Sequence, residues 1–332
     1  MKKLSLIIGL FCILLGLGAV LFIPAALLTK PAANAPVITV EIPEGSSIKD
    51  ISRILVERKI LGSMTGYRLY AKLDDVASKA KAGTYEIAFG SSYRQIARML
   101  SVGPARAEAT ITVVEGRTIA DLMEELSKMG ATVALGDFAA DRYRVDHPVL
   151  NDIPANGTLE GYLFPDTYRV WKDQLPVSLI EKQLVEFDDQ TNGFREEAEK
   201  QGRSFYDVMI LASIVEKEAR HDEDRPIVAG IFLNRIKGGM RLQSDATLNY
   251  VIRSGRSRLT NEDLQNPSPY NTYMHDGLPP GPIGNPGLES IKAALNPAKT
   301  EYYFFLTDDK GKTYYARNLE EHIQNRYKAY GE

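Results

Sequence analysis

The sequence predicts an α+β protein in which a membrane-spanning helix precedes a small domain and a larger one. Three observations support this prediction. An uncharged apolar run covers residues 4–29, a strand–turn–helix pattern occurs three times before residue 127, and helical patterns dominate the second half of the chain. With 332 residues the chain is long enough for two domains. Its 40 Lys and Arg against 43 Asp and Glu do not indicate a protein that binds nucleic acid.

The apolar run is long enough to cross a membrane, because a spanning helix needs roughly 20 residues. Lys2 and Lys3 precede it and favour a cytoplasmic N-terminus. We expect a cytoplasmic tip at 1–3, a single-pass anchor at 4–29, a tether at 30–36 and an extracytoplasmic remainder. A cleavable signal peptide is the alternative, since Ala33-Asn34-Ala35 fits a cleavage site, but the run is longer than the roughly 7–15 apolar residues of a signal peptide.

A repeated pattern organises the next part of the chain. Residues 39–55, 84–100 and 110–126 each read as a short strand, a glycine turn, a Ser or Thr that can cap a helix, and an amphipathic helix. The spacings between copies are unequal, which argues against a solenoid. A further helical pattern at 64–73 gives the order strand, helix, helix, strand over residues 37–88.

The stretch from Ser204 to Arg220 is predicted to be a helix that holds one acidic group in place. Its apolar residues recur at helical spacing and form a stripe: Val208, Leu211, Ala212, Val215 and Ala219. Glu216 falls at one border of this stripe, Lys217 on the water side, and Glu218 at the opposite border. A carboxyl beside apolar surface has a raised pKa and can donate a proton near neutral pH. From the pattern alone, an acidic residue such as Glu216 on an amphipathic helix is usually a solvated surface residue.

Local signals predict the remaining elements. Helices are expected at residues 177–187, 194–201, 227–236, 246–252, 288–295 and 319–330, and a hairpin at 302–306 and 313–316. Ser244 or Asp245 can cap the helix at 246–252. The segment 266–287 is rich in Pro and Gly, and we expect it to be a rigid wall that carries Asn271 and Tyr273 to a substrate.

Five motifs follow one another in the second domain. They are Ala212-Ser-Ile-Val-Glu216-Lys-Glu218, Asn234-Arg235, Arg241-Leu-Gln-Ser-Asp245, Tyr270-Asn-Thr-Tyr273 and Gly277-Leu-Pro-Pro-Gly-Pro-Ile283. In this order they resemble the endolytic murein transglycosylases of the YceG-like family, and the likeness runs through nearly all of the chain after Ala35. The resemblance implies a LysM-like subdomain at 37–105 and a catalytic YceG-like domain at 106–332.

The resemblance also implies a mechanism and a location. A lytic transglycosylase cleaves the β-1,4 bond between N-acetylmuramic acid and N-acetylglucosamine of peptidoglycan, and leaves a 1,6-anhydro end because the muramic 6-hydroxyl is the nucleophile. One acid is then enough, whereas ordinary glycosidases use two carboxylates. We expect Glu216 to be this acid, with no cofactor. The expected location is the bacterial plasma membrane, with the catalytic domain outside and peptidoglycan synthases as partners by analogy.

Six further residues are candidates for binding the glycan. The resemblance places Gln243, Asp245, Asn271 and Tyr273 near the substrate. Glu160 and Asp166 are the other two candidates. They belong to the segment Leu159-Glu160-Gly-Tyr-Leu-Phe-Pro-Asp166-Thr-Tyr168, which matches a motif that the family uses near its active site. No individual role is assigned to any of the six.

Three other functional classes are alternatives. A non-catalytic, membrane-tethered protein that binds peptidoglycan through the LysM-like unit is the main alternative. A metal-dependent hydrolase is disfavoured because the four histidines, His147, His221, His275 and His322, show no ligand spacing. A serine hydrolase is disfavoured because the sequence has no Gly-x-Ser-x-Gly motif. Cys12, the only cysteine, lies in the apolar run, so no disulfide forms within the chain.

Overall fold

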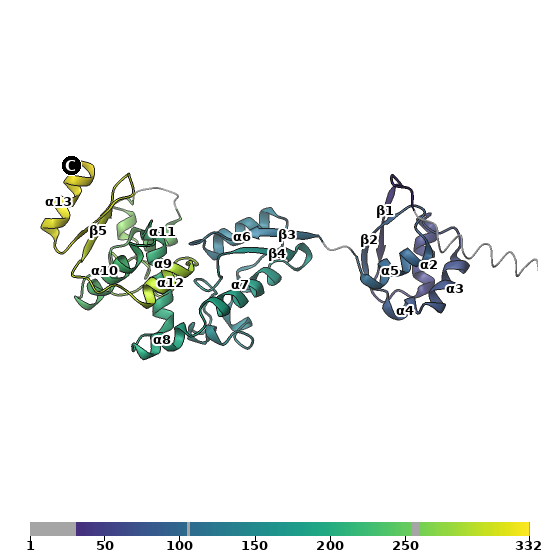
Figure 1. Ribbon diagram of the computed structural model, residues 1–332, viewed down its shortest axis with the longest axis horizontal. Coiled ribbons are helices and arrows are strands. Elements are labelled where there is room, and N and C mark those ends of the chain that lie inside the picture. The colour runs from purple at the N-terminus through teal and green to yellow at the C-terminus, as the bar shows by residue number, and fades with distance from the viewer. Residues whose placement is uncertain (1–30, 105–106, 254–258, 332) are drawn as a thin grey trace, which may run out of the picture. The chain divides into compact units, whose positions relative to one another are not determined.

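The structure is a computed structural model that describes residues 31–104, 107–253 and 259–331. The expected anchor at 4–29 lies outside these residues. Within them, no helix has both the length and the apolar character needed to cross a membrane. The chain divides into two compact units, Met1–Arg106 and Ala107–Glu332, called here the N-terminal and C-terminal units (Figure 1).

Within residues 31–104, the N-terminal unit consists of four helices and a two-stranded sheet. Its elements are β1 (Val37–Ile42), α2 (Ile48–Glu57), α3 (Met64–Leu73), α4 (Val76–Lys79), β2 (Gly83–Ala88) and α5 (Tyr93–Val102). β1 and β2 are antiparallel, with Val40 opposite Tyr85. Both of these residues are buried in a core that also contains Leu55, Tyr67 and Ile87. The predicted order of strand, helix, helix, strand is found, with the short α4 added before β2.

The predicted repeat is confirmed by three capping boxes. The helices α2, α5 and α6 (Ile119–Lys128) begin after Ser47, Ser92 and Thr118, whose hydroxyls each accept a hydrogen bond from the backbone three residues on. The side chain at that third position bonds back to the cap residue in each case. The third copy, β3 (Glu108–Thr112) followed by α6, belongs to the C-terminal unit.

The C-terminal unit is a mixed α+β structure, as predicted. Its other elements are β4 (Thr167–Trp171), α7 (Val177–Gln190), α8 (Phe194–Lys200), α9 (Phe205–Glu218), α10 (Arg225–Lys237), α11 (Asp245–Ile252), α12 (Leu288–Leu295), β5 (Phe304–Thr307), β6 (Thr313–Ala316) and α13 (Leu319–Tyr330). Short 3₁₀ segments are Leu135–Phe138, Ala140–Arg142, Pro148–Asp152, Lys172–Gln174 and Asp263–Gln265. β3 pairs with β4 and β5 with β6, both antiparallel.

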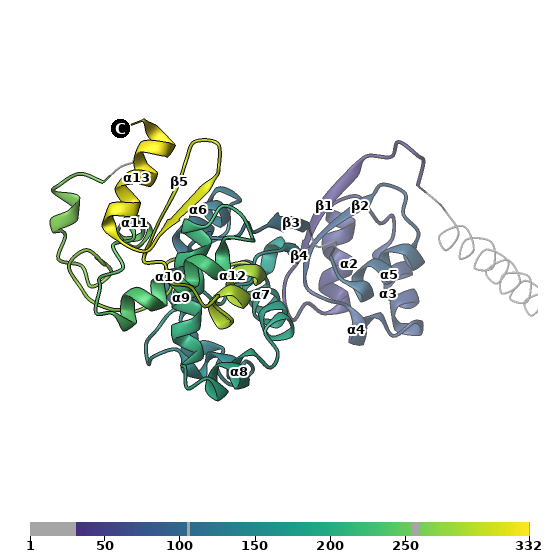
Figure 2. The same ribbon diagram turned by 60° about the vertical axis from the view of Figure 1, so that its left-hand side comes forward.

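The central helix of this unit is α9. It packs against α8, α10, α11 and α12 (Figure 2). Every residue from Val208 to Val215 is buried. The prediction of one apolar stripe with a water-facing side is therefore wrong for most of α9. A helix segment that is buried all round lies in the interior, and α9 reaches a surface only in its first and last turns.

Candidate active site

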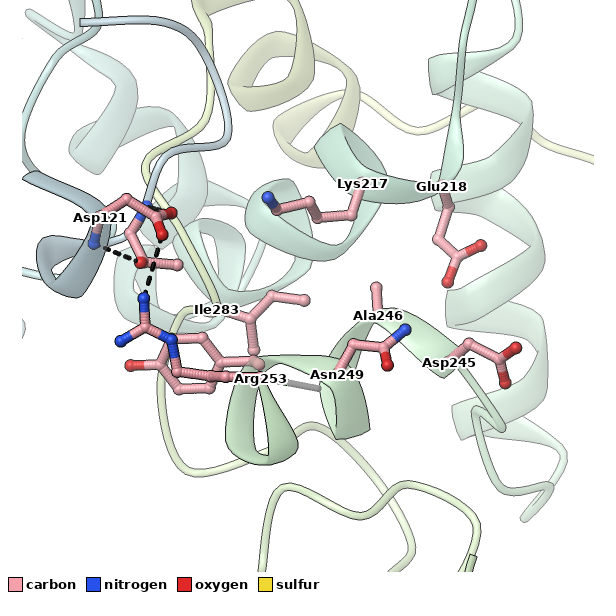
Figure 3. Close-up of a pocket in the computed structure, with 10 residues that line it drawn as sticks. Asp121, Lys217, Glu218, Asp245, Ala246, Asn249, Arg253 and Ile283 are labelled. Carbon is pink, nitrogen blue, oxygen red and sulfur yellow. Dashed lines mark hydrogen bonds and ion pairs between the residues drawn. The ribbon is translucent and has the colours of Figure 1, made fainter. Parts of the chain in front are cut away.

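Two cavities adjoin the C-terminal end of α9. The first, of about 590 Å³, lies between the start of α6 and α11, and its walls include Thr118, Asp121, Asn249, Tyr250 and Arg253 (Figure 3). The second, of about 700 Å³, extends toward the β5–β6 hairpin and α13, and its walls include Arg235, Gln243, Tyr273 and Phe304. Lys217, Glu218 and Asp245 line both cavities. These three residues therefore stand where the two hollows meet.

Glu218 is the acidic group of α9 that lies at this junction. It is the last residue of the helix and is half-buried. The Ser244 hydroxyl donates a hydrogen bond of 2.5 Å to its Oε1. Burial raises the pKa of the Glu218 carboxyl above its ordinary value, and the nearby charge of Asp245 adds to the rise. Hydrogen bonds from Ser244 and the Ala246 backbone, together with the charge of Arg235, act in the opposite direction.

Ser244 occupies the predicted cap position of α11 but does not cap it. Its side chain makes no hydrogen bond to the first turn of the helix, because the hydroxyl is directed to Glu218 instead. Its backbone N–H donates to the Thr272 hydroxyl at 3.1 Å, and Thr247 also contacts that hydroxyl, at 2.9 Å. The start of α11 is thereby fixed beside Glu218, where a helix N-terminus stabilises negative charge.

Glu216 lies on the other side of α9 and lines neither cavity. Its Oε2 accepts hydrogen bonds from Arg225 Nη1 at 2.8 Å and from the Gly287 backbone N–H at 3.0 Å. The Glu216 and Arg225 side chains are only 8% and 9% exposed. Arg225 also contacts the Ser290 hydroxyl. The ion pair therefore joins α9, α10 and α12, and the structure does not place Glu216 where a substrate can reach it.

Three of the expected glycan-binding residues gather around Glu218. Asp245 is the first residue of α11, and the Tyr273 hydroxyl donates a hydrogen bond of 2.5 Å to its Oδ1. Gln243 and Tyr273 line the second cavity. Gln243 has a φ of 48°, a left-handed conformation that is uncommon outside glycine, and such strain is often found at functional sites.

The other three expected residues do not face this junction. Asn271 is fully buried, and its Nδ2 donates to the carbonyls of Leu264 and Asn266 at 3.1 and 2.7 Å, so it holds the loop together. Asp166 is exposed just before β4, and its Oδ1 accepts a hydrogen bond from the Thr167 N–H. Neither residue meets the two cavities, and the expectation that they bind glycan lacks support from their positions.

Glu160 is buried behind the first cavity rather than within it. Only 5% of the residue is exposed, and its carboxylate accepts hydrogen bonds from the Ile119 N–H at 3.1 Å, Asn285 Nδ2 at 3.1 Å and the Tyr250 hydroxyl at 3.2 Å. Burial raises the pKa of the Glu160 carboxyl to about 7. Through these contacts Glu160 ties together α6, α11 and the loop at Asn285, which form walls of the first cavity.

Glu218, Ser244 and Tyr250 were not among the site residues predicted from the sequence. Glu218 is part of the same motif as Glu216, but a helical projection shows only which way each side chain leaves the helix. Its partner Ser244 lies 26 positions further along the chain. The described residues contain no group of three or more His, Cys, Asp or Glu arranged to hold a metal ion.

The comparisons with known proteins agree with the fold and with the motifs. The YceG-like family model matches residues 40–328. An endolytic murein transglycosylase of Bacillus subtilis strain 168 is 33% identical over 327 residues, which cover 94% of this chain and 90% of that protein. An endolytic murein transglycosylase of Streptococcus pneumoniae serotype 2 strain D39 is 30% identical over 329 residues, which cover 90% of this chain and 60% of that longer protein.

A solved structure is also similar. The crystal structure of a yceG-like protein from Listeria monocytogenes has 34% sequence identity and a TM-score of 0.58, and the match covers 88% of this chain and all of that one.

Proposed function

The chain belongs to the YceG-like family, and from that premise we propose that it is a lytic murein transglycosylase with Glu218 as its general acid. The proposed substrate is the glycan strand of peptidoglycan, cleaved at the β-1,4 bond between N-acetylmuramic acid and N-acetylglucosamine. Relatives that are endolytic murein transglycosylases, at 30–33% identity over most of the chain, support this function. The observation that carries it is the partly buried Glu218 carboxyl at the junction of two cavities.

Glu218 replaces Glu216 in the proposed mechanism. The protonated Glu218 carboxyl donates its proton to the glycosidic oxygen as the bond to the anomeric carbon breaks. The 6-hydroxyl oxygen of the same muramic residue then bonds to that carbon, and its proton passes to the Glu218 carboxylate. The product is a 1,6-anhydro ring, no water is consumed, and Glu218 returns to its protonated form. Burial helps by keeping the carboxyl protonated at higher pH than in water.

Asp245 and Tyr273 are the groups that we assign to the developing positive charge. Oxygen atoms near an oxocarbenium-like anomeric carbon stabilise it electrostatically. The hydrogen bond from the Tyr273 hydroxyl to Asp245 holds the Asp245 carboxylate beside the junction. Gln243, on the second-cavity side, is assigned to sugar hydroxyl or acetamido groups.

The position of Glu218 also supports cleavage within a strand. Cavities on both sides of the acid leave room for sugars on both sides of the broken bond. A site for removing terminal units would need space mainly on one side. We therefore propose endolytic cleavage, which is also the activity in the name of the Bacillus subtilis relative.

Two further parts of the proposal concern the chain outside the C-terminal unit. We propose that residues 4–29 anchor the enzyme in the plasma membrane with the catalytic unit outside, next to newly made strands and to peptidoglycan synthases. The uncharged apolar run and the preceding lysines support this. We also propose that the N-terminal unit is a LysM-like module; its strand, helix, helix, strand order supports the assignment.

Product analysis tests the proposed function. Purified sacculi are digested with the protein, and soluble and insoluble glycans are analysed by mass spectrometry. We expect 1,6-anhydro ends and fragments of many lengths from the earliest times. Binding to sacculi without any anhydro product would favour the non-catalytic scaffold, and release of only the shortest fragments would exclude endolytic cleavage.

A further inference from the structure

Lys217 places a positive charge at the same junction as Glu218. It is exposed and lines both cavities, and its side chain extends over the first cavity toward α6 (Figure 3). Glu216 and Glu218 are its neighbours in sequence, but Lys217 leaves α9 in a different direction from either. The mechanism proposed above gives this cation no role.

The Lys217 side chain lies along a wall made by two glycines. A Cβ atom added to Gly116 would lie 3.4 Å from Lys217 Nζ, and one added to Gly284 would lie 3.5 Å from Lys217 Cε. A Cβ at Gly284 would also lie only 2.6 Å from the Gly116 carbonyl oxygen. The two loops are joined by a hydrogen bond of 2.7 Å from the Gly116 N–H to the Asn285 carbonyl. The absence of side chains at both glycines leaves this space to the lysine.

The ammonium of Lys217 forms no ion pair with the acidic residues that line the first cavity, Asp121, Glu218 and Asp245. The other cation of the first cavity, Arg253, is paired with Asp121 at 3.0 Å. Asp245 accepts a hydrogen bond from Tyr273. Across residues 31–104, 107–253 and 259–331, Lys217 forms neither a hydrogen bond nor an ion pair. The cavity therefore offers, beside the acid, a positive charge that interacts with the charge of the buried Glu160 but forms no ion pair.

We infer that Lys217 binds a carboxylate carried on the 3-oxygen of the muramic residue and so selects which glycosidic bond meets Glu218. This inference rests on the proposed function. The two sugars of the strand alternate, and only the muramic residue carries a lactyl group, which ends in a carboxylate when free or bears a peptide with its own carboxylates. N-acetylglucosamine has no anionic group. The alternating strand can lie with either of its two kinds of glycosidic bond at Glu218. One well-placed cation is therefore enough to distinguish these two positions.

Kinetics with matched substrates and variants test this inference. The full-length protein is assayed in detergent as the wild type, Lys217→Met, Lys217→Arg and Lys128→Met. Three kinds of strand are supplied. The first carries peptides, the second has no peptides and carries a free lactyl carboxylate, and the third has no peptides and an amidated lactyl carboxylate. Lys128, an exposed α6 residue paired with Glu124, serves as the control for loss of one positive charge. Thermal melts verify that all variants are folded.

We expect Lys217→Met to lower kcat/KM on the charged strands by about 10- to 100-fold, the range for a hydrogen bond between charged groups. The loss should appear mainly in KM, Lys217→Arg should retain most activity, and Lys128→Met should equal wild type. Amidation should lower wild-type kcat/KM to a similar degree and add nothing in Lys217→Met. A loss confined to peptide-free strands assigns the lactyl carboxylate, and one confined to peptide-bearing strands assigns a peptide carboxylate.

Equal losses on charged and amidated strands, or no loss on either charged strand, would overturn the inference. Failure of the underlying function gives a different result, because the wild-type protein would then release no anhydro-ended product from any of the three substrates.

Discussion

The two carboxylates at the end of α9 have the same chemistry and opposite surroundings. Glu216 points toward α10 and α12, where a guanidinium and a backbone amide occupy its Oε2. Glu218 points toward α11 and two cavities, where a neutral hydroxyl is its side-chain partner. A carboxylate bound by an arginine stabilises the fold in its charged form, whereas one beside a hydroxyl and partly removed from water can hold and release a proton. The partners of the two carboxylates, rather than their positions in one helix, are the basis for proposing a structural role for Glu216 and a catalytic role for Glu218.

Removing the acid on the cavity side should have the largest effect. We expect Glu218→Gln to lower the rate of anhydro-product release by roughly 10²- to 10⁴-fold, the usual contribution of a general acid, without changing the melting temperature. Glu216→Gln is the matched substitution on the other side, and it should keep most of the activity per folded molecule. The measurement is the release of anhydro-ended product from sacculi by both variants. If Glu216→Gln were the inactive variant, the roles assigned to Glu216 and Glu218 would be reversed.

Removing the ion pair on the α10 side should be costly for stability. Glu216→Ala leaves Arg225 buried without its closest carboxylate, and loss of one partner of a buried pair costs about 3–5 kcal/mol. We expect a melting temperature lower by about 10 °C, measured by circular dichroism or calorimetry. An unchanged melting temperature would show that the pair does not support the fold.

The buried Glu160 tests whether a raised pKa alone identifies a catalytic acid. Its pKa of about 7 in the folded protein lies above the ordinary value of 4.5, so the folded state binds the proton more tightly than the unfolded chain does. The stability from this proton is fully present below about pH 4.5 and is lost as pH rises through about 7.

The measurement is urea unfolding of wild type and Glu160→Gln at several pH values. Relative to the variant, wild type should lose about 3 kcal/mol between pH 4.5 and 8. The exposed Glu289, replaced by Gln, should leave the wild-type dependence unchanged. Parallel pH profiles for wild type and Glu160→Gln would contradict the assignment of a proton to this buried site.

The smallest expected effect concerns the Ser244 hydroxyl, which donates a hydrogen bond to Glu218. Ser244→Ala removes a donor to the charged form of Glu218, so the pKa of Glu218 should rise further and the acid should stay protonated to higher pH. The alkaline limb of kcat/KM should move upward by about half to one pH unit, in line with about 1 kcal/mol per hydrogen bond. Ser244→Thr keeps the hydroxyl and should keep the limb in place; a downward shift in Ser244→Ala would reverse the sign argued here.

Local signals in the sequence predicted much of the fold. The capping boxes at Ser47, Ser92 and Thr118 depend on contacts over three residues, and all three are present. The hairpin of β5 and β6 and the helices α8, α12 and α13 lie within a few residues of their predicted positions. These elements are encoded in neighbouring residues, which a single sequence displays directly.

The site was harder to predict because distant segments decide it. The four helices that bury α9 come from three separate parts of the chain. Apolar residues therefore lie all round α9 and do not indicate which side of the helix faces the cavities. Ser244 carried a capping signal that was overridden by Glu218. Asn271 and Tyr273 stand two apart in one loop, yet one is a buried internal brace and the other lines a cavity. The residue types and their spacing were predicted correctly, but the direction in which each side chain points depends on the tertiary contacts.

The arrangement of the two cavities bears on how a glycan strand would reach Glu218. Peptidoglycan is a cross-linked mesh whose strands seldom offer a free terminus, so an enzyme that had to thread its polymer through a tunnel would find few starting points. Both hollows beside Glu218 are partly open to solvent. Under the proposed function, a strand would therefore enter them sideways, between two cross-links, and after scission each half would leave by its own route.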